Sequence, residues 1–229
     1  MELIREVKEV EIDVRGDIIR NDDKWIYDWL EWESTCPNDI KNALLTMPAG
    51  DTLVVNINSG GGSVTAGQEI YSLLHGRQDV EIHIQSLAGS AASVIAMANT
   101  CKMSPVATIM IHNVSMSGAS GDYHDMQKNA EVLKTMNSAL AEAYVSKTGK
   151  TKDEILKMMD RETWITASQA LEMGFIDEIE ELQTKVSNSI NGIRLTEEIR
   201  QQVTKEKELR DKNEKLKNEL LSDLDKYGV

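Results

Sequence analysis

The stretch AGSAASVIAMA (residues 88–98) decides the fold and the chemistry of this chain, because a strand gives way to a helix within it. The preceding residues VEIHIQ (80–85) alternate apolar and polar side chains, which predicts a strand. The helix is expected to begin at Ser90 or Ala91 and to carry Ser93 near its positive end. A serine hydroxyl is a weak nucleophile unless a neighbouring base accepts its proton. Ser93 therefore needs a base and an oxyanion site from other parts of the chain.

Two other segments can supply those groups. INSGGGSVTAG (57–67) contains a glycine turn whose backbone amides can stabilise an oxyanion. IMIHNVS (109–115) places His112 at the end of an apolar run, where an imidazole can act as a base. The glycine run is a poor match to a phosphate-binding loop, because no GK[ST] sequence follows it. The other histidines are expected at helix ends or on a strand: His75, His83 and His124.

With DRETWITASQALEMGFID (160–177), these segments resemble the proteolytic subunit of the Clp protease (ClpP), a serine peptidase family. In that family a glycine turn, an AAS nucleophile turn, an MIH base and an acidic residue before a Thr/Ser-Ala helix follow in this order. The resemblance covers residues 10 to 180. Within the family, the chain is most similar to the ClpP-like head maturation (prohead) proteases of tailed phages and prophages. The features that indicate this are WIYDWLEW (25–32), AASVIAMA (91–98) and ETW (162–164).

The resemblance implies roles for individual residues, beginning with the nucleophile. Ser93 is the expected nucleophile and His112 the expected base. Ser86 and Ser90 compete with Ser93 only as serines near a helix start, where a serine commonly serves as a cap. No metal and no organic cofactor is implied.

The third triad member and the oxyanion hole also follow from the resemblance. The family register places Glu162 as the acid, with Asp160 as the alternative, because either carboxylate can orient the imidazole. The backbone amides of Gly62 and Val94 are expected to form the oxyanion hole, and Gly60 stands where the family usually has proline. An edge strand within 114–123 is expected to pair with an extended substrate. The expected substrate-binding residues are Gly61, Ser115, Met116, Ser117 and Gly118.

The order of elements predicts an α/β fold. Strand-then-helix units of this length indicate parallel crossovers. The resemblance implies a ClpP/crotonase-like repeated ββα core, a long protruding handle helix and a C-terminal charged helical tail. Strands are predicted at 10–14, 52–58, 80–85 and twice within 101–113, helices at 38–47, 65–74 and 121–149, and a strand or ordered loop at 25–37.

The chain is predicted to contain two parts. Residues 1–184 form the peptidase domain, and 185–229 form a hinge and a charged helical extension. The extension is either a solvated single helix or a weak self-associating or partner-binding coil, since leucines recur in it at heptad spacing. The long helix at 121–149 carries apolar residues at intervals of three and four. In the family, the corresponding helix joins two rings.

Composition excludes several classes of protein. Residues 194–229 hold 9 basic and 9 acidic side chains, so residues 1–193 carry the whole net charge of −13. This argues against a nucleic-acid surface, which needs a basic patch. No apolar run of signal-peptide or membrane-span length is present, so we expect a cytoplasmic protein with no membrane partner. If the chain is phage-encoded, this means the host cytoplasm or the procapsid interior. Cys36 and Cys101 match no metal-binding spacing and are expected as reduced thiols.

The resemblance, together with the serine and histidine motifs, implies a serine endopeptidase that acts through an acyl-enzyme inside a homo-oligomeric ring. The family expectation is a seven-membered ring, single or stacked, with a capsid or scaffold polypeptide as substrate. The alternative is a general ClpP-type subunit that works with an ATP-dependent unfoldase, disfavoured by the short charged segment before Val10. A catalytically impaired assembly protein on the same fold is the third hypothesis. A crotonase-type acyl-CoA enzyme is the fourth, and it has no use for the serine and histidine motifs.

Overall fold

The computed structural model describes residues 7–181, Lys205 and Lys212. Apart from these two lysines, the predicted hinge and charged extension at 185–229 lie outside the described residues. Within the described part of the chain, no helix is both long enough and apolar enough to cross a lipid bilayer.

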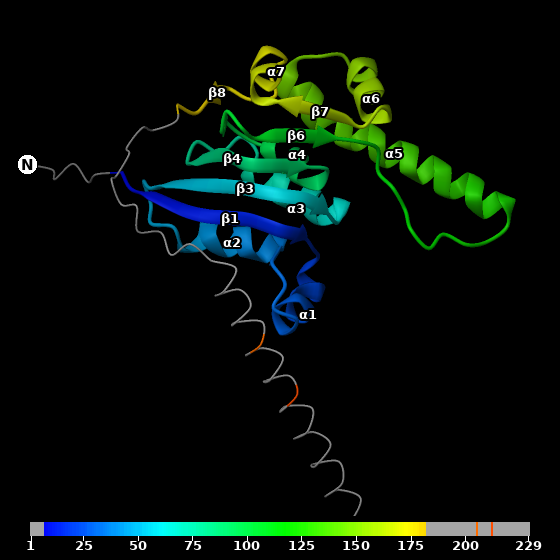
Figure 1. Ribbon diagram of the computed structural model, residues 1–229, viewed down its shortest axis with the longest axis horizontal. Helices are drawn as coiled ribbons and strands as arrows, with labels where there is room; N and C mark the ends of the chain where they lie inside the picture. The colour runs from blue at the N-terminus through cyan, green and yellow to red at the C-terminus, as the bar shows by residue number, and fades with distance from the viewer. Residues whose placement is uncertain (1–6, 182–204, 206–211, 213–229) are drawn as a thin grey trace, which may run out of the picture. The chain divides into compact units, whose positions relative to one another are not determined.

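A mostly parallel sheet forms the centre of the described chain (Figure 1). Its strands follow the order β2-β1-β3-β4-β5-β8, while β6 pairs with both β4 and β7. Among the pairings of the described strands, only that of β6 with β7 is antiparallel. The strands are β1 (Glu9–Ile18), β2 (Ser34–Thr35), β3 (Thr52–Gly62), β4 (Val80–Gly89), β5 (Cys101–Met103), β6 (Thr108–Ile111), β7 (Thr163–Thr166) and β8 (Glu178–Ile179).

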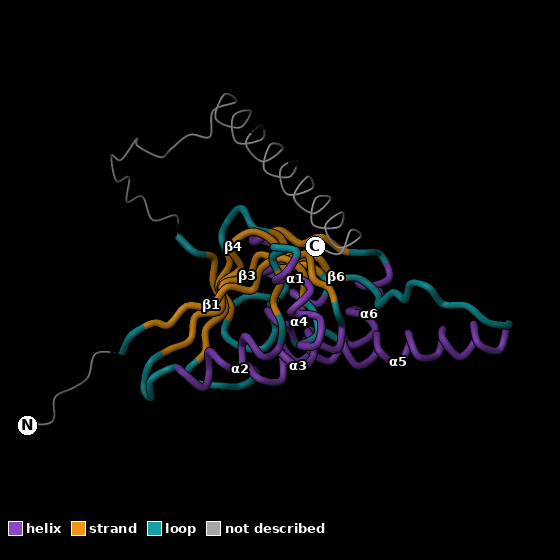
Figure 2. Tube along the Cα trace, turned by 90° about the horizontal axis from the view of Figure 1, so that it is seen from below, coloured by secondary structure: helices purple, strands orange, loops and turns teal. Residues whose placement is uncertain are grey.

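Helices follow the strands and cover one side of the sheet, where Figure 2 shows α2, α3 and α5 running along the same layer. Parallel neighbours need a crossover connection of this kind, so the expected α/β architecture is confirmed. The helices are η1 (Asn21–Asp23), α1 (Lys24–Trp29), α2 (Pro37–Thr46), α3 (Val64–Leu74), α4 (Ala91–Ala96), α5 (Tyr123–Thr148), α6 (Lys152–Asp160) and α7 (Ala167–Glu172).

The core between sheet and helices is largely aliphatic. On β3, Leu53 and Val55 are fully buried, and Val54 on the opposite face is only 5% exposed. Burial on both faces is typical of a parallel strand inside an α/β protein. The strand predicted at 52–58 therefore occupies a central position in the sheet, between β1 and β4.

The segment 25–37 differs from its prediction. It forms the helix α1 and then the short strand β2, whereas a strand or loop without a helix was expected. Trp25 and Trp29 are 67% and 76% exposed, so no apolar stripe marks the buried side of this helix. The next helix, α2, forms as predicted, but its cap is Cys36 rather than Asn38.

The loop between β6 and α5 also differs from its prediction. No strand forms within 114–123, and the Val114 amide at its start donates to the Asn137 side chain on α5 (2.7 Å). The long helix α5 itself is confirmed, with Asp122 as its N-cap. Its free end extends away from the sheet in Figure 1, and its buried residues all belong to the C-terminal third.

Candidate active site

The turn from β4 into α4 holds Ser90 in a strained conformation. The strand ends at Gly89, the helix begins at Ala91, and Ser90 between them has φ 51° and ψ −121°. Positive φ costs a residue other than glycine about 1–3 kcal/mol, and such strain concentrates at functional sites. A sharp strand-to-helix turn also lifts a serine hydroxyl out of the backbone for attack. The Ser90 amide donates to the Met110 carbonyl (2.9 Å), which fixes the turn against β6.

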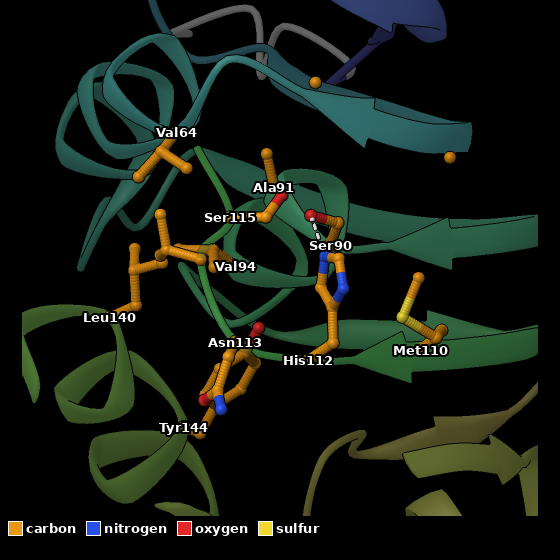
Figure 3. A pocket seen from close by; sticks show the side chains of 13 residues that line it. Val64, Ser90, Ala91, Val94, Met110, His112, Asn113, Ser115, Leu140 and Tyr144 are labelled. Carbon is orange, nitrogen blue, oxygen red and sulfur yellow. Dashed lines mark hydrogen bonds between the residues drawn. The ribbon is translucent and has the colours of Figure 1, made fainter. Parts of the chain in front are cut away.

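His112 reaches this turn from the end of β6. Its Nε2 lies 2.8 Å from Oγ of Ser90, and Figure 3 shows the imidazole directed at that hydroxyl. This distance is within the range in which a histidine can remove a hydroxyl proton. The structure therefore brings His112 together with Ser90.

Ser93, the expected nucleophile, lies elsewhere. Its side chain is fully buried, and its Oγ donates to the Ser90 carbonyl oxygen at 2.6 Å. The same Oγ lies 2.7 Å from the Tyr144 hydroxyl. The expected pair of Ser93 with His112 is thus not formed in the structure. The strand-helix junction distinguishes the two serines, because the residue at the junction is the one that the turn presents.

The glycine turn packs directly against Ser90. Gly61 has φ +104°, and a Cβ there would lie 2.7 Å from the Ser90 Cβ and 2.9 Å from the Ala91 nitrogen. Only glycine fits this approach. Gly62, with φ +148°, lines the same cavity as Ser90 and His112. The structure therefore places the glycine turn beside Ser90, whereas it was expected to serve Ser93.

The expected oxyanion donor Val94 is engaged elsewhere. Its amide donates to the Ser90 carbonyl at 3.3 Å, in the first turn of α4. The Ala91 amide stands at the first position of that helix, where backbone amides have no partner within the helix. Ala91 also follows Ser90 directly. The geometry therefore favours Ala91 over Val94 as a donor beside Gly62.

Both candidate acids lie close to the end of β6, after which His112 follows. β6 pairs with β7 so that Ile111 is opposite Thr163, and one residue beyond this pair come His112 and Glu162. Asp160 accepts a hydrogen bond from the Asn113 side chain (2.8 Å).

Neither acid contacts the imidazole in the described chain. Glu162 instead accepts a hydrogen bond from the Trp164 indole (3.3 Å). Within residues 7–181, the structure records no hydrogen bond between His112 and either Glu162 or Asp160, so the third member stays a prediction.

A cavity of about 250 Å³ opens at the hydroxyl of Ser90. Val64, Val94 and Leu140 face it from one side, opposite His112 (Figure 3). Of the predicted substrate-binding residues, Ser115 lines this cavity and Gly61 packs under the turn. Three others lie on the exposed loop outside the residues that line it: Met116, Ser117 and Gly118.

Acidic and metal-binding side chains do not gather at the cavity. Within the described residues, no group of three or more histidine, cysteine, aspartate or glutamate side chains is arranged to hold a metal ion.

Burial raises the pKa of the Tyr144 phenol, so this hydroxyl at the cavity wall stays protonated at neutral pH.

Comparisons with known proteins identify the family that this chain resembles in sequence. A family model described as Clp protease matches residues 12–183. The ATP-dependent Clp protease proteolytic subunit 2 of Tropheryma whipplei is 33% identical over 150 residues, which cover 62% of this chain and 82% of that protein. The proteolytic subunit 1 of Protochlamydia amoebophila is 38% identical over 158 residues, which cover 66% of this chain and 72% of the relative. The matched region contains the glycine turn, the serine turn and the histidine, and the chain therefore belongs to the Clp protease family of serine peptidases.

Proposed function

We propose that this chain is the proteolytic subunit of an ATP-dependent Clp-type protease and hydrolyses peptide bonds through an acyl-enzyme on Ser90. The observation that carries the proposal is the 2.8 Å contact between His112 Nε2 and Ser90 Oγ at a strained turn. Such strain persists only where the surrounding structure imposes it, and it is concentrated at functional sites. The same contact disfavours a catalytically impaired assembly protein.

The mechanism follows from the positions of these groups. Oγ of Ser90 attacks the scissile carbonyl while His112 accepts its proton, and the histidine then protonates the departing amine. Water, activated by the same imidazole, hydrolyses the ester. The amides of Gly62 and Ala91 are the proposed oxyanion donors, and one such donor is worth about 2.7–4 kcal/mol in a comparable enzyme. Glu162 is the proposed acid, with Asp160 as the alternative.

The cavity indicates which side chain precedes the cleaved bond. Val64, Val94 and Leu140 offer an apolar wall beside Ser90. An apolar side chain gains about 25 cal/mol for each Å² that it buries there. We therefore propose an extended, unfolded polypeptide with an apolar residue at P1 as the substrate.

Assembly into a ring is part of the proposal. In the single chain neither acid touches His112, and the projecting half of α5 exposes apolar side chains, with Met126 39% and Val132 41% exposed. Contacts between copies would cover this half of α5 and the neighbouring 113–122 loop. A seven-membered ring, single or stacked, is the family expectation.

Two biological roles are considered, and they differ in how the enzyme obtains its substrate: from an ATP-dependent unfoldase, or directly from a capsid or scaffold precursor. The relatives described above bear the names of ATP-dependent Clp protease subunits, which supports an unfoldase partner better than the expected role in phage head maturation. The head-maturation hypothesis depends on three sequence features: WIYDWLEW (25–32), AASVIAMA (91–98) and ETW (162–164). It predicts cleavage of a folded capsid or scaffold precursor without ATP.

One experiment tests the proposal and separates these roles. The purified oligomer is given a blocked peptide with an apolar P1 residue and a coumarin leaving group, then a folded protein with and without a Clp-type ATPase and ATP. We expect peptide hydrolysis that is absent in Ser90→Ala, and degradation of the folded protein only with the ATPase and ATP. Peptide hydrolysis retained by Ser90→Ala would overturn the proposed mechanism. ATP-independent cleavage of a capsid precursor would favour the head-maturation role.

A further inference from the structure

We infer that Ser93 and Tyr144 are positioning residues, which form a buried chain of hydroxyl groups that holds the carbonyl of the nucleophile Ser90 in place. This inference deepens the proposed function, because it assumes that Ser90 is the nucleophile. It gives a role to two buried polar groups that the proposed mechanism does not otherwise use.

The direction of the hydrogen bonds follows from the number of available protons. A serine hydroxyl has one proton to donate. Ser93 donates it to the Ser90 carbonyl oxygen at 2.6 Å. Tyr144, whose hydroxyl oxygen is 2.7 Å from Ser93 Oγ, must then be the donor of the second bond. The chain therefore runs from Tyr144 through Ser93 to the backbone of Ser90, and hydrogen bonds in such a series strengthen one another.

Burial makes these bonds consequential. Ser93 is fully buried and Tyr144 is 2% exposed, so water does not replace a lost partner readily. A buried hydroxyl without a partner is unfavourable, so the Tyr144 hydroxyl, the Ser93 hydroxyl and the Ser90 carbonyl constrain one another's positions. Burial raises the pKa of Tyr144, so its phenol remains a proton donor at neutral pH.

The group that the chain holds is the backbone of the strained residue itself. The Ser90 carbonyl accepts from the Ser93 amide (3.0 Å), the Val94 amide (3.3 Å) and the Ser93 hydroxyl (2.6 Å). The ψ angle of −121° sets the direction of this carbonyl relative to the Cα atom whose side-chain Oγ meets His112. Three donors on one carbonyl oppose relaxation of this conformation into an ordinary helix start.

The chain also links the turn to α5. Tyr144 lies on the buried end of that helix, where its ring contacts Phe175 with centroids 6.1 Å apart. The projecting half of the same helix is mostly exposed. A shift of α5 along its axis would move the Tyr144 hydroxyl and release the Ser93 side chain. The geometry of Ser90 thus depends on where α5 is held.

The test compares Tyr144→Phe and Ser93→Ala in the assembled enzyme, with Tyr71→Phe as the matched control. Tyr71 is also a partly buried tyrosine on a helix, but the structure records no hydrogen bond of its hydroxyl within the described residues. The readouts are kcat and KM for a peptide substrate, normalised to titrated active sites. The rate of labelling of Ser90 by a fluorophosphonate and the melting temperature are measured as well.

We expect Tyr144→Phe and Ser93→Ala each to lower kcat and the labelling rate by about three- to tenfold, the effect of one hydrogen bond, with KM within twofold. The double variant should resemble the singles, because either change breaks the same chain. Tyr71→Phe should leave kcat unchanged. A lower melting temperature with unchanged kcat in Tyr144→Phe would overturn the inference and leave a packing role. Absence of any labelling at Ser90 in the wild-type oligomer would instead overturn the proposed function.

Discussion

The imidazole of His112 and the hydroxyl of Ser90 meet at 2.8 Å because two strands hold their backbones in register. β4 pairs with β6 in parallel, with Gly89 opposite Met110, and the Ser90 amide donates to the Met110 carbonyl. Both residues therefore follow paired strand ends, where side chains from different strands converge in parallel sheets. The register of the sheet, rather than a flexible loop, sets the distance between the proposed base and the proposed nucleophile.

The close approach of the glycine turn predicts a severe effect of Gly61→Ala. The added Cβ at position 61 would lie 2.7 Å from the Ser90 Cβ, and this clash would displace the serine. We expect kcat to fall by about 10²-fold, the cost of a misplacement near 1 Å. Gly50→Ala is the matched control, since Gly50 also has positive φ (+89°) but no atom within 4 Å of the built Cβ. Equal losses of activity in the two variants would contradict the steric explanation.

The acid can be assigned by replacing each carboxylate with its amide. In the assembled enzyme, Glu162→Gln should lower kcat by about 10³–10⁴-fold, as loss of the acid does in other serine peptidases. Asp160→Asn should change kcat by no more than a few fold, because its bond to Asn113 is on the surface. Steady-state hydrolysis of the peptide substrate measures both. The opposite ranking would transfer the role to Asp160.

The apolar wall predicts a change in P1 preference for Leu140→Ala. Removing this side chain enlarges the cavity, so kcat/KM should shift from leucine toward phenylalanine at P1 by about tenfold. Leu74→Ala is the control, because Leu74 is fully buried but does not line the cavity. Both variants should lose about 2–5 kcal/mol of stability. A preference that stays constant in Leu140→Ala would show that P1 binds elsewhere.

The charge cluster on β4 and β5 predicts a specific pH dependence of stability. Desolvation raises the pKa of Glu81, but hydrogen bonds from Lys102 and His83 outweigh it and leave the pKa lowered. A lowered pKa in the folded state stabilises the protein above the ordinary glutamate pKa of about 4.3, and this contribution is lost as the pH falls through the lower value.

Chemical denaturation from pH 7 to pH 3 measures this contribution. The unfolding free energy falls as the pH is lowered, and Glu81→Gln should make this fall smaller by about 0.5–1 kcal/mol, a value discounted for partial exposure. Glu178→Gln should have less effect, since that carboxylate is 3.8 Å from Lys102 and 58% exposed. If Glu81→Gln leaves the loss of unfolding free energy between pH 7 and pH 3 unchanged, the cluster does not contribute to stability as described.

The spacing of apolar residues along the sequence predicted those strands and helices that bury one or both faces in the core. β3, β4 and α5 formed within a few residues of their expected limits, because apolar side chains recur at intervals of one or two residues in the strands and of three and four in the helix. Helix α1 was missed because its tryptophans face solvent and give no such signal.

The site shows where sequence reasoning stops. Ser90 and Ser93 both follow small residues, so the choice between them depends on the residue at which β4 ends, and boundaries are the least certain part of a sequence prediction. The glycine turn and His112 could be predicted because their motifs occur once. The contact of the acid with His112 could not, since it is absent from the single chain.

The most direct test of the central claim is fluorophosphonate labelling of the oligomer, followed by peptide mass mapping, in the wild type, Ser90→Ala and Ser93→Ala. We predict modification of Ser90 in the wild type and no modification in Ser90→Ala. Ser93→Ala should still be labelled at Ser90, at a lower rate. Modification of Ser93 itself, or labelling that persists in Ser90→Ala, would contradict the account.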